Sequence, residues 1–140
     1  MDINVPFIPF LDLRRQYATI DDEIHDAIYS VLNQCAFTSG PAVAAFEADF
    51  AQYCGVRHCI GVNSGTSALH LALIACGVGT GDEVITVPMT FVATAWAISY
   101  VGARPVFVDI EPDTCTVDVD QVKRAITSRS RAIQIGRAHV

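Results

Sequence analysis

Residues 83–109 have the sequence EVITVPMTFVATAWAISYVGARPVFVD, in which two short apolar runs flank a longer one. The runs Glu83–Val87 and Pro105–Asp109 have the length and β-branched content of buried strands. The stretch Phe91–Tyr100 between them predicts a helix. Two strands joined by a helix are typical of a parallel pair, because parallel strands need a long crossover connection. We therefore expect an α/β fold built around this strand–helix–strand unit.

The same alternation extends in both directions from this unit. Before it, His58–Val62 predicts a strand and Ser64–Cys76 a helix. After it, Asp118 is expected to cap a helix that runs to about Thr127, and Arg131–Ile133 begins a further strand. Short apolar strands that alternate with helices are typical of a largely parallel sheet covered by helices on both faces.

The first sixty residues predict an extended arm followed by two helices. Residues 3–13 are interrupted by prolines and form the arm. Thr19 is expected to cap the first helix, with Asp22 three residues on, before apolar residues at helical spacing. Ser39–Pro41 opens the second helix, because proline suits a first helical turn, and Gly55 ends it.

The last residues depart from the strand pattern. Residues 135–140 read Ile-Gly-Arg-Ala-His-Val, which, followed by a stop codon, is what a common sequencing adapter encodes in one reading frame. The same adapter would complete the codon of Gln134. We therefore expect residues 134–140 to be a non-native tail and exclude them from reasoning about the fold. No repeat, low-complexity segment or linker divides the rest, so residues 1–133 are predicted to form one partial domain.

Composition and charge argue against several classes of protein. Of the 140 residues, 51% are hydrophobic and 17% are charged, which suits a piece of a larger α/β core. The net charge of −6 and the scattered basic residues argue against binding to nucleic acid. The N-terminus lacks the basic region of a signal peptide, and no apolar run is long enough to span a membrane. A cytoplasmic location is expected.

The cysteines and histidines do not form a recognisable site. Five cysteines, at positions 35, 54, 59, 76 and 115, are an odd number without a Cys-x-x-Cys pair. This is not the pattern of a disulfide scaffold, so we expect reduced and mostly buried thiols. The four histidines have no metal-ligand spacing, and a zinc site is not expected.

A small polar turn carries the first candidate site, in the stretch Val62-Asn-Ser-Gly-Thr-Ser-Ala-Leu-His-Leu-Ala-Leu73. The first amides of a helix have no partner inside it, and the helix dipole adds positive charge, so a phosphate dianion is a natural ligand there. Gly65 would let the backbone approach the phosphate, and Thr66 and Ser67 could add hydroxyl donors. The pattern is neither a P-loop nor a dinucleotide fingerprint. The alternative is an ordinary strand-to-helix turn capped by Ser64 or Thr66.

Phe91 is the second candidate, in the stretch Val87–Ala95 that follows the next predicted strand. In open α/β sheets, ligands bind beside the carboxyl ends of the strands. An aromatic ring at that place could cover a flat ring cofactor. The alternative is a core phenylalanine at a helix start.

Together these stretches resemble the DegT/DnrJ/EryC1/StrS family of sugar aminotransferases, which depend on pyridoxal 5'-phosphate (PLP). The resemblance extends over nearly all of residues 6–133. It is carried, in order, by Ser39-Gly-Pro-x-Val43, Phe46-Glu47, Tyr53-x-Gly55, Val62-Asn-Ser-Gly-Thr-x-Ala-Leu-x-Leu-Ala-Leu73, Gly81-Asp-Glu-Val84, Thr90-Phe-Val-Ala-Thr94 and Val108-Asp109. The Asn-Ser-Gly-Thr and Thr-Phe-Val-Ala-Thr blocks are highly specific as a pair.

The resemblance implies the N-terminal part of the large domain of a fold-type I PLP-dependent transferase, truncated. It implies that Gly65 and Thr66 bind the cofactor phosphate and that Phe91 stacks on the pyridine ring. The family's Schiff-base lysine and the acidic partner of its ring nitrogen lie beyond the end of this chain. Lys123 matches a solvated helix face and Asp109 a structural turn, so no catalytic residue is predicted among residues 1–140.

The resemblance also implies an activity for the full-length parent. It would transfer an amino group from glutamate or glutamine to a nucleotide-linked keto-sugar, as a homodimer. Two alternatives stay open: a sugar dehydratase of the same family, with histidine in place of the lysine, and a non-catalytic phosphate-binding or regulatory module. The 140-residue chain alone is expected to be inactive because it lacks the lysine.

Overall fold

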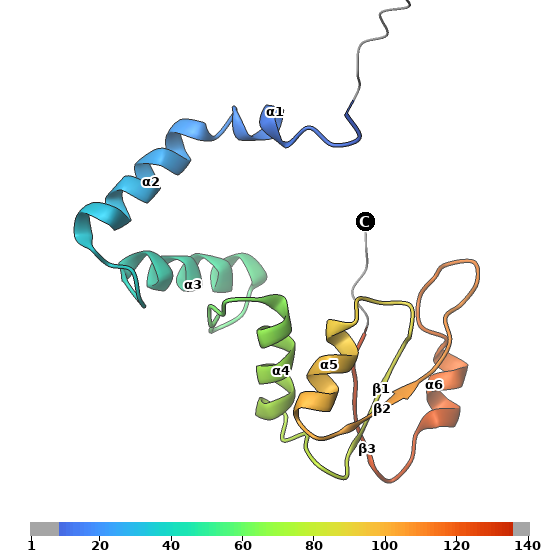
Figure 1. The fold of residues 1–140 in the computed structure, drawn as a ribbon. Helices are drawn as coiled ribbons and strands as arrows, with labels where there is room; N and C mark the ends of the chain where they lie inside the picture. Colours follow the sequence, from blue (N-terminus) through green and yellow to red (C-terminus); the bar gives the residue numbers. More distant parts are fainter. Residues whose placement is uncertain (1–8, 136–140) are drawn as a thin grey trace, which may run out of the picture. The chain divides into compact units, whose positions relative to one another are not determined.

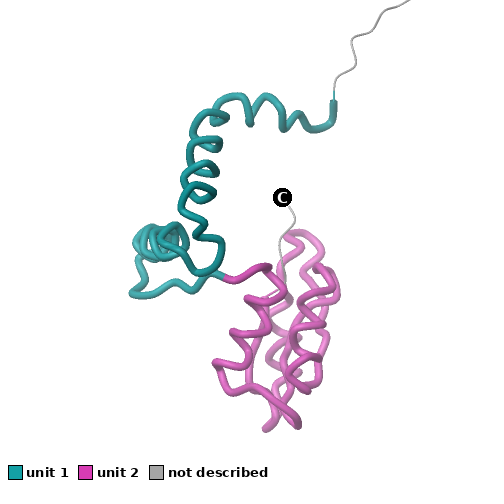
Figure 2. Tube along the Cα trace, turned by 60° about the vertical axis from the view of Figure 1, so that its left-hand side comes forward, with its two compact units in different colours: residues 1–61 teal, residues 62–140 magenta. Residues whose placement is uncertain are grey.

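The computed structural model describes residues 9–135 and divides the chain into two compact units, residues 1–61 and residues 62–140 (Figure 1). Figure 2 shows the two units in different colours. The first unit is helical, and the second combines helices with a sheet. Our expectations for residues 3–8 and 136–140 lie outside the described residues.

The first unit contains the two predicted helices and a short one before them. The three helices are α1 (Leu13–Tyr17), α2 (Asp21–Gln34) and α3 (Pro41–Cys54). The boundaries of α3 confirm the prediction, because Gly40 is its N-cap and Gly55 ends it in the left-handed conformation, at φ 67°.

The predicted cap of α2 is wrong. Ile20 occupies the N-cap position, and no side chain caps the helix there. The hydroxyl of Thr19 instead donates to the carbonyl of Gln16 at 2.7 Å. The Thr19 hydroxyl bonds to the preceding helix because α1 ends at Tyr17, and the last carbonyls of a helix lack donors within the helix.

The second unit is a three-stranded parallel sheet with three helices. Its elements, in chain order, are α4 (Gly65–Ala75), β1 (Glu83–Thr86), α5 (Ala93–Tyr100), β2 (Arg104–Phe107), α6 (Val119–Ala125) and β3 (Ser130–Ile133). The strand order is β2-β1-β3, and β1 pairs in parallel with both neighbours. The expected α/β class and the parallel sheet are confirmed.

One predicted strand is wrong. Residues 58–62 form no strand. A strand requires a neighbour that accepts and donates along its length, and residues 58–62 pair with none of the three strands β1, β2 and β3. The amide of Gly61 donates instead to the Glu47 carboxylate of α3, at 2.7 Å.

The central strand β1 is buried on both faces. Val84 packs in one cluster with Leu73 of α4 and Ile98 of α5. Its neighbour Ile85 packs in another cluster with Val122 of α6. Successive side chains of a strand point to opposite faces, so α4 and α5 cover one face of the sheet and α6 the other, as Figure 1 shows. Because the three strands are parallel, they all begin on one side of the sheet and end on the other.

We call the side where the three strands begin the amino edge, and the side where they end the carboxyl edge. Each helix precedes the strand to which it leads: α4 precedes β1, α5 precedes β2 and α6 precedes β3. Each helix therefore runs back along the sheet, and its first turn lies at the carboxyl edge (Figure 1). That edge is where ligands bind in open α/β sheets.

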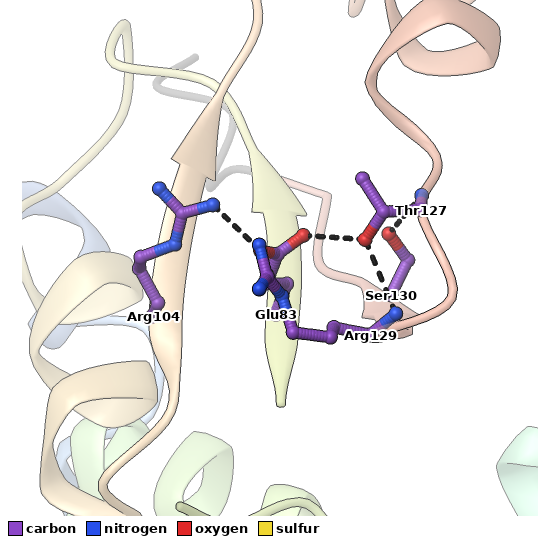
Figure 3. Close-up of polar contacts among 5 residues, drawn as sticks. All are labelled: Glu83, Arg104, Thr127, Arg129 and Ser130. Atoms are coloured by element: carbon purple, nitrogen blue, oxygen red, sulfur yellow. Dashed lines mark hydrogen bonds and ion pairs between the residues drawn. The ribbon is translucent and has the colours of Figure 1, made fainter. Parts of the chain in front are cut away.

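At the amino edge, a buried carboxylate joins the starts of the three strands (Figure 3). The Oε1 atom of Glu83 accepts from Arg104 of β2 at 2.6 Å and from Arg129, just before β3, at 2.7 and 2.8 Å. Its Oε2 atom accepts from the Thr127 hydroxyl at 2.8 Å. The bond from Arg104, followed by that from Thr127, lowers the pKa of Glu83 to about 2, although burial acts in the opposite direction. Glu83 is therefore charged and fully partnered.

The cysteines are free but not mostly buried as expected. Cys35, Cys54, Cys76 and Cys115 are exposed, and Cys59 is half-buried. Three of them lie at the C-terminal ends of α2, α3 and α4, and Cys115 lies in a turn with φ 54°. Helix ends and turns lie at the surface, which explains the exposure.

Within residues 9–135, no helix has the length and apolar character needed to cross a membrane. The same part of the chain holds no group of three or more His, Cys, Asp or Glu side chains arranged to bind a metal ion.

Candidate functional site

The first turn of α4 begins at the carboxyl edge and is capped by Ser64. Ser64 is in the extended conformation, with φ −162° and ψ 157°. Its hydroxyl oxygen accepts a hydrogen bond from the amide of Ser67 at 3.1 Å. Of the two caps considered in the alternative interpretation, Ser64 is the actual one. We refer to residues 63–67 as the α4 turn.

Capping by Ser64 provides a hydrogen-bond acceptor for only one amide of the α4 turn, that of Ser67. The first amides of a helix lack partners within the helix, and those of Gly65 and Thr66 have no acceptor within residues 9–135. The Thr66 hydroxyl likewise has no acceptor in that part of the chain, and the residue is half-buried. Three donors therefore stand together where the helix dipole favours a negative charge.

Open space lies beside the first of these donors. Apart from its chain neighbours and the backbone of its own helix, a Cβ atom built onto Gly65 would meet no atom of the described residues within 4 Å. Packing inside the described chain therefore does not require a glycine at this position. The space next to the backbone can instead be filled by a ligand, which a side chain at residue 65 would displace.

A hydroxyl network lies beside the donors and corrects one expectation. The Ser67 hydroxyl donates to Oδ1 of Asn63 at 2.7 Å, so it does not offer its proton to a ligand. The Ser64 hydroxyl donates in turn to the Ser67 oxygen at 3.0 Å. We did not predict the role of Asn63. The signal available in the sequence was the spacing of four residues between an Asn and a Ser across a helix start.

Phe91 lies at the same edge, between β1 and α5. It is 43% exposed, so the described residues do not enclose it. Its carbonyl accepts from the amide of Thr94 at 3.0 Å, which fixes the backbone just ahead of α5. The helices α4 and α5 pack against each other and both begin at the carboxyl edge. The structure thus brings Gly65, Thr66 and Phe91 to one edge of the sheet.

The two charged residues that might be mistaken for catalytic groups are otherwise engaged. Lys123 is exposed on α6 and pairs with Asp120 at 2.9 Å, as expected for a solvated helix face. Asp109 accepts from the amide of Ile110 at 2.8 Å, and its own amide donates to the side chain of Gln121 at 3.0 Å. Both belong to the local structure around α6.

The comparisons with known proteins agree with this architecture. The family model described as the DegT/DnrJ/EryC1/StrS aminotransferase family matches residues 18–137. A pleiotropic regulatory protein of Geobacillus stearothermophilus is 46% identical over 126 residues, which are 90% of this chain and 34% of that protein. The dTDP-3-amino-3,4,6-trideoxy-alpha-D-glucose transaminase of Streptomyces venezuelae is 45% identical over 130 residues, which are 93% of this chain and 34% of the enzyme.

A solved structure agrees with the same architecture. The crystal structure of S. venezuelae DesV matches with a TM-score of 0.88 at 45% identity, and the match covers 92% of this chain and 35% of that one. The chain thus spans about a third of the length of the curated relatives that it matches.

Proposed function

Because the chain belongs to the DegT/DnrJ/EryC1/StrS aminotransferase family, we propose that its α4 turn binds the phosphate of PLP, the cofactor on which this family depends. The observation that carries the proposal is the pair of amides at Gly65 and Thr66, which lack protein acceptors within residues 9–135, beside open space. Phosphate is the anion that such a helix start suits.

Each of the three site residues has a distinct role in this proposal. Gly65 lets the phosphate approach the backbone, because it carries no side chain where the ligand must lie. The hydroxyl of Thr66 is a third donor to the phosphate, beside the backbone amides of Gly65 and Thr66. Phe91, exposed at the same edge, covers the face of the cofactor ring. When bound, PLP supplies the carbonyl that takes up the amino group and a ring that withdraws electrons.

We propose further that the full-length protein transfers an amino group from glutamate or glutamine to a nucleotide-linked keto-sugar. The transaminase from S. venezuelae, named for a dTDP-linked amino sugar, supports this substrate class. The protein would act as a cytoplasmic homodimer. Residues 1–140 alone are expected to be inactive, because Lys123 is paired on an exposed helix face and no other lysine is present.

Two other functions are testable against this one. A sugar dehydratase of the same family would bind PLP in the same turn but release no aminated sugar. A regulatory module is the second candidate, because one relative is named a pleiotropic regulatory protein. Incubating the full-length protein with PLP, glutamate and dTDP-, UDP- and GDP-linked keto-sugars tests the transaminase: an aminated sugar supports it, and PLP binding without any aminated product contradicts it.

PLP titration of the full-length protein, followed by absorbance, tests the cofactor site. Thr66→Val removes a donor to a dianion, which is worth about 1.5–3 kcal/mol, so affinity should fall roughly tenfold or more. Gly65→Val places a branched side chain in the space for the phosphate, so binding should be lost. Phe91→Ala should weaken binding while inorganic phosphate still competes as in the wild type.

Thr80→Val is the matched control, because it makes the same chemical change in the exposed turn before β1, at the opposite edge. It should bind PLP like the wild type. If folded Gly65→Val and Thr66→Val variants also bind like the wild type, the phosphate site lies elsewhere and the proposal fails.

A further inference from the structure

The hydroxyl network of the α4 turn contains more than a cap requires. A serine N-cap needs only the bond from the Ser67 amide to Ser64. The network adds two side-chain bonds, from Ser64 to Ser67 at 3.0 Å and from Ser67 to Asn63 at 2.7 Å. Both hydroxyl protons are thereby committed, and the last acceptor in the sequence of bonds is the carboxamide of Asn63.

We propose that Asn63 and Ser67 are positioning residues for the phosphate site, acting through Ser64. This inference rests on the proposed function. The Ser67 hydroxyl donates to Asn63, and the Asn63 carboxamide oxygen accepts, so neither group is a donor to the phosphate. Together they decide which donors of the α4 turn face the ligand.

The first consequence of the network is a choice among the amides. Since Ser64 accepts from the amide of Ser67, that amide is removed from the ligand, and the amides of Gly65 and Thr66 remain. A Ser64 hydroxyl without its bond to Ser67 could rotate and release the cap. The bond from Ser67 to Asn63 holds the Ser67 oxygen in place as the acceptor for Ser64.

The second consequence concerns the strength of a site without cations. Residues 62–68 contain no lysine or arginine, so the α4 turn itself offers a phosphate dianion only amide and hydroxyl donors. Its contribution depends on the direction of a few dipoles, because the turn has no point charge to compensate for a misdirected donor. Loosening the turn should therefore weaken phosphate binding more than it weakens the fold.

The test compares ligands with and without a phosphate on the full-length protein. Ser67→Ala and Asn63→Ala each remove one neutral hydrogen bond, so the affinity for PLP should fall about three- to tenfold. Competition by inorganic phosphate should weaken by a similar factor. The affinity for pyridoxal, which lacks the phosphate, should stay unchanged. Ser67→Thr keeps the hydroxyl and should restore PLP binding to within about twofold of the wild type.

Matched controls are Ser128→Ala and Asn33→Ala, which change exposed residues that are not part of the α4 turn and should leave every affinity unchanged. Wild-type PLP affinity in both turn variants, or an equal loss for pyridoxal, overturns the inference and indicates a purely structural role. Gly65→Val separates the two proposals. If it abolishes PLP binding while Ser67→Ala and Asn63→Ala do not weaken it, only the positioning roles are wrong, and if it too binds normally, the phosphate site itself is wrong.

Discussion

The two edges of the sheet satisfy their polar groups in opposite ways. At the amino edge, both carboxylate oxygens of buried Glu83 have protein partners, from residues 21 to 46 positions away in the chain. At the carboxyl edge, the amides of Gly65 and Thr66 have no acceptor within the described part of the chain. Burying a charge without a partner costs much free energy, whereas an unpaired amide beside open space is accessible to a ligand. The amino edge thus holds the strands together, and the carboxyl edge is available for binding.

The largest loss of stability should follow from breaking the amino edge. Glu83→Gln in the full-length protein deprives the exposed Arg104 and Arg129 side chains of the buried anion that they share, and hydrogen bonds to a charged group are the costlier ones to lose. The melting temperature should fall sharply, as measured by calorimetry. Asp120→Asn, which breaks the exposed pair with Lys123, is the control and should change it little. Equal effects of the two changes would mean that Glu83 does not hold the strands.

The pH dependence of stability should report the same carboxylate. The pKa of Glu83 is lowered from 4.5 to about 2 in the folded state, so its ionised form favours folding. Its stabilisation is therefore complete above about pH 4.5 and is lost as the pH falls toward 2. Urea unfolding at a series of pH values measures this, and the Glu83→Gln protein should show a flatter decline over that window. Parallel curves for the two proteins would contradict the assignment.

A smaller effect should follow from removing the cap at the carboxyl edge. Ser64→Ala deprives the Ser67 amide of its acceptor, which should cost about 1 kcal/mol of stability. Denaturant unfolding of the full-length protein measures the loss. Ser64→Gly should cost less, because glycine is tolerated at N-caps. A loss as large as that of Glu83→Gln would show that the two edges do not differ as described.

Local patterns in the sequence were enough to predict most of the second unit. The apolar runs at Glu83–Val87 and Pro105–Asp109 became β1 and β2, and the Asp118 cap accepts from the amides of Asp120 and Gln121 as expected. That capping, led by the bond from Gln121, lowers the pKa of Asp118. Caps and helix periods involve neighbours in the chain, which is why they can be read without a structure.

The features that were missed depend on distant residues or on competing partners. Residues 58–62 look like a strand, but a strand exists only with a neighbour, which its own sequence does not specify. The partners of Glu83 are equally remote. In the candidate site, the sequence predicts Gly65 and Thr66 at the helix start, as observed, and it allows the Ser67 hydroxyl as a further donor, which the structure instead commits to Asn63. Clustered polar side chains have several possible partners, and only the structure chooses among them.

The smallest predicted effect concerns a second unsatisfied group near the carboxyl edge. The Oε1 atom of Gln134, just after β3, is buried and has no partner within residues 9–135, while its Nε2 donates to the carbonyl of Thr94 at 3.3 Å. Unlike the amides of the α4 turn, this acceptor is enclosed and should only cost stability. Gln134→Met removes the buried oxygen, a gain of about 1–3 kcal/mol that the lost Nε2 bond of about 0.5–1.5 kcal/mol partly offsets. The net gain should be on the order of 1 kcal/mol, measured by denaturant unfolding of the 140-residue chain. A loss of stability would contradict the assignment, because it would mean that the Gln134 side chain contributes more to folding through its hydrogen bonds than its buried oxygen costs.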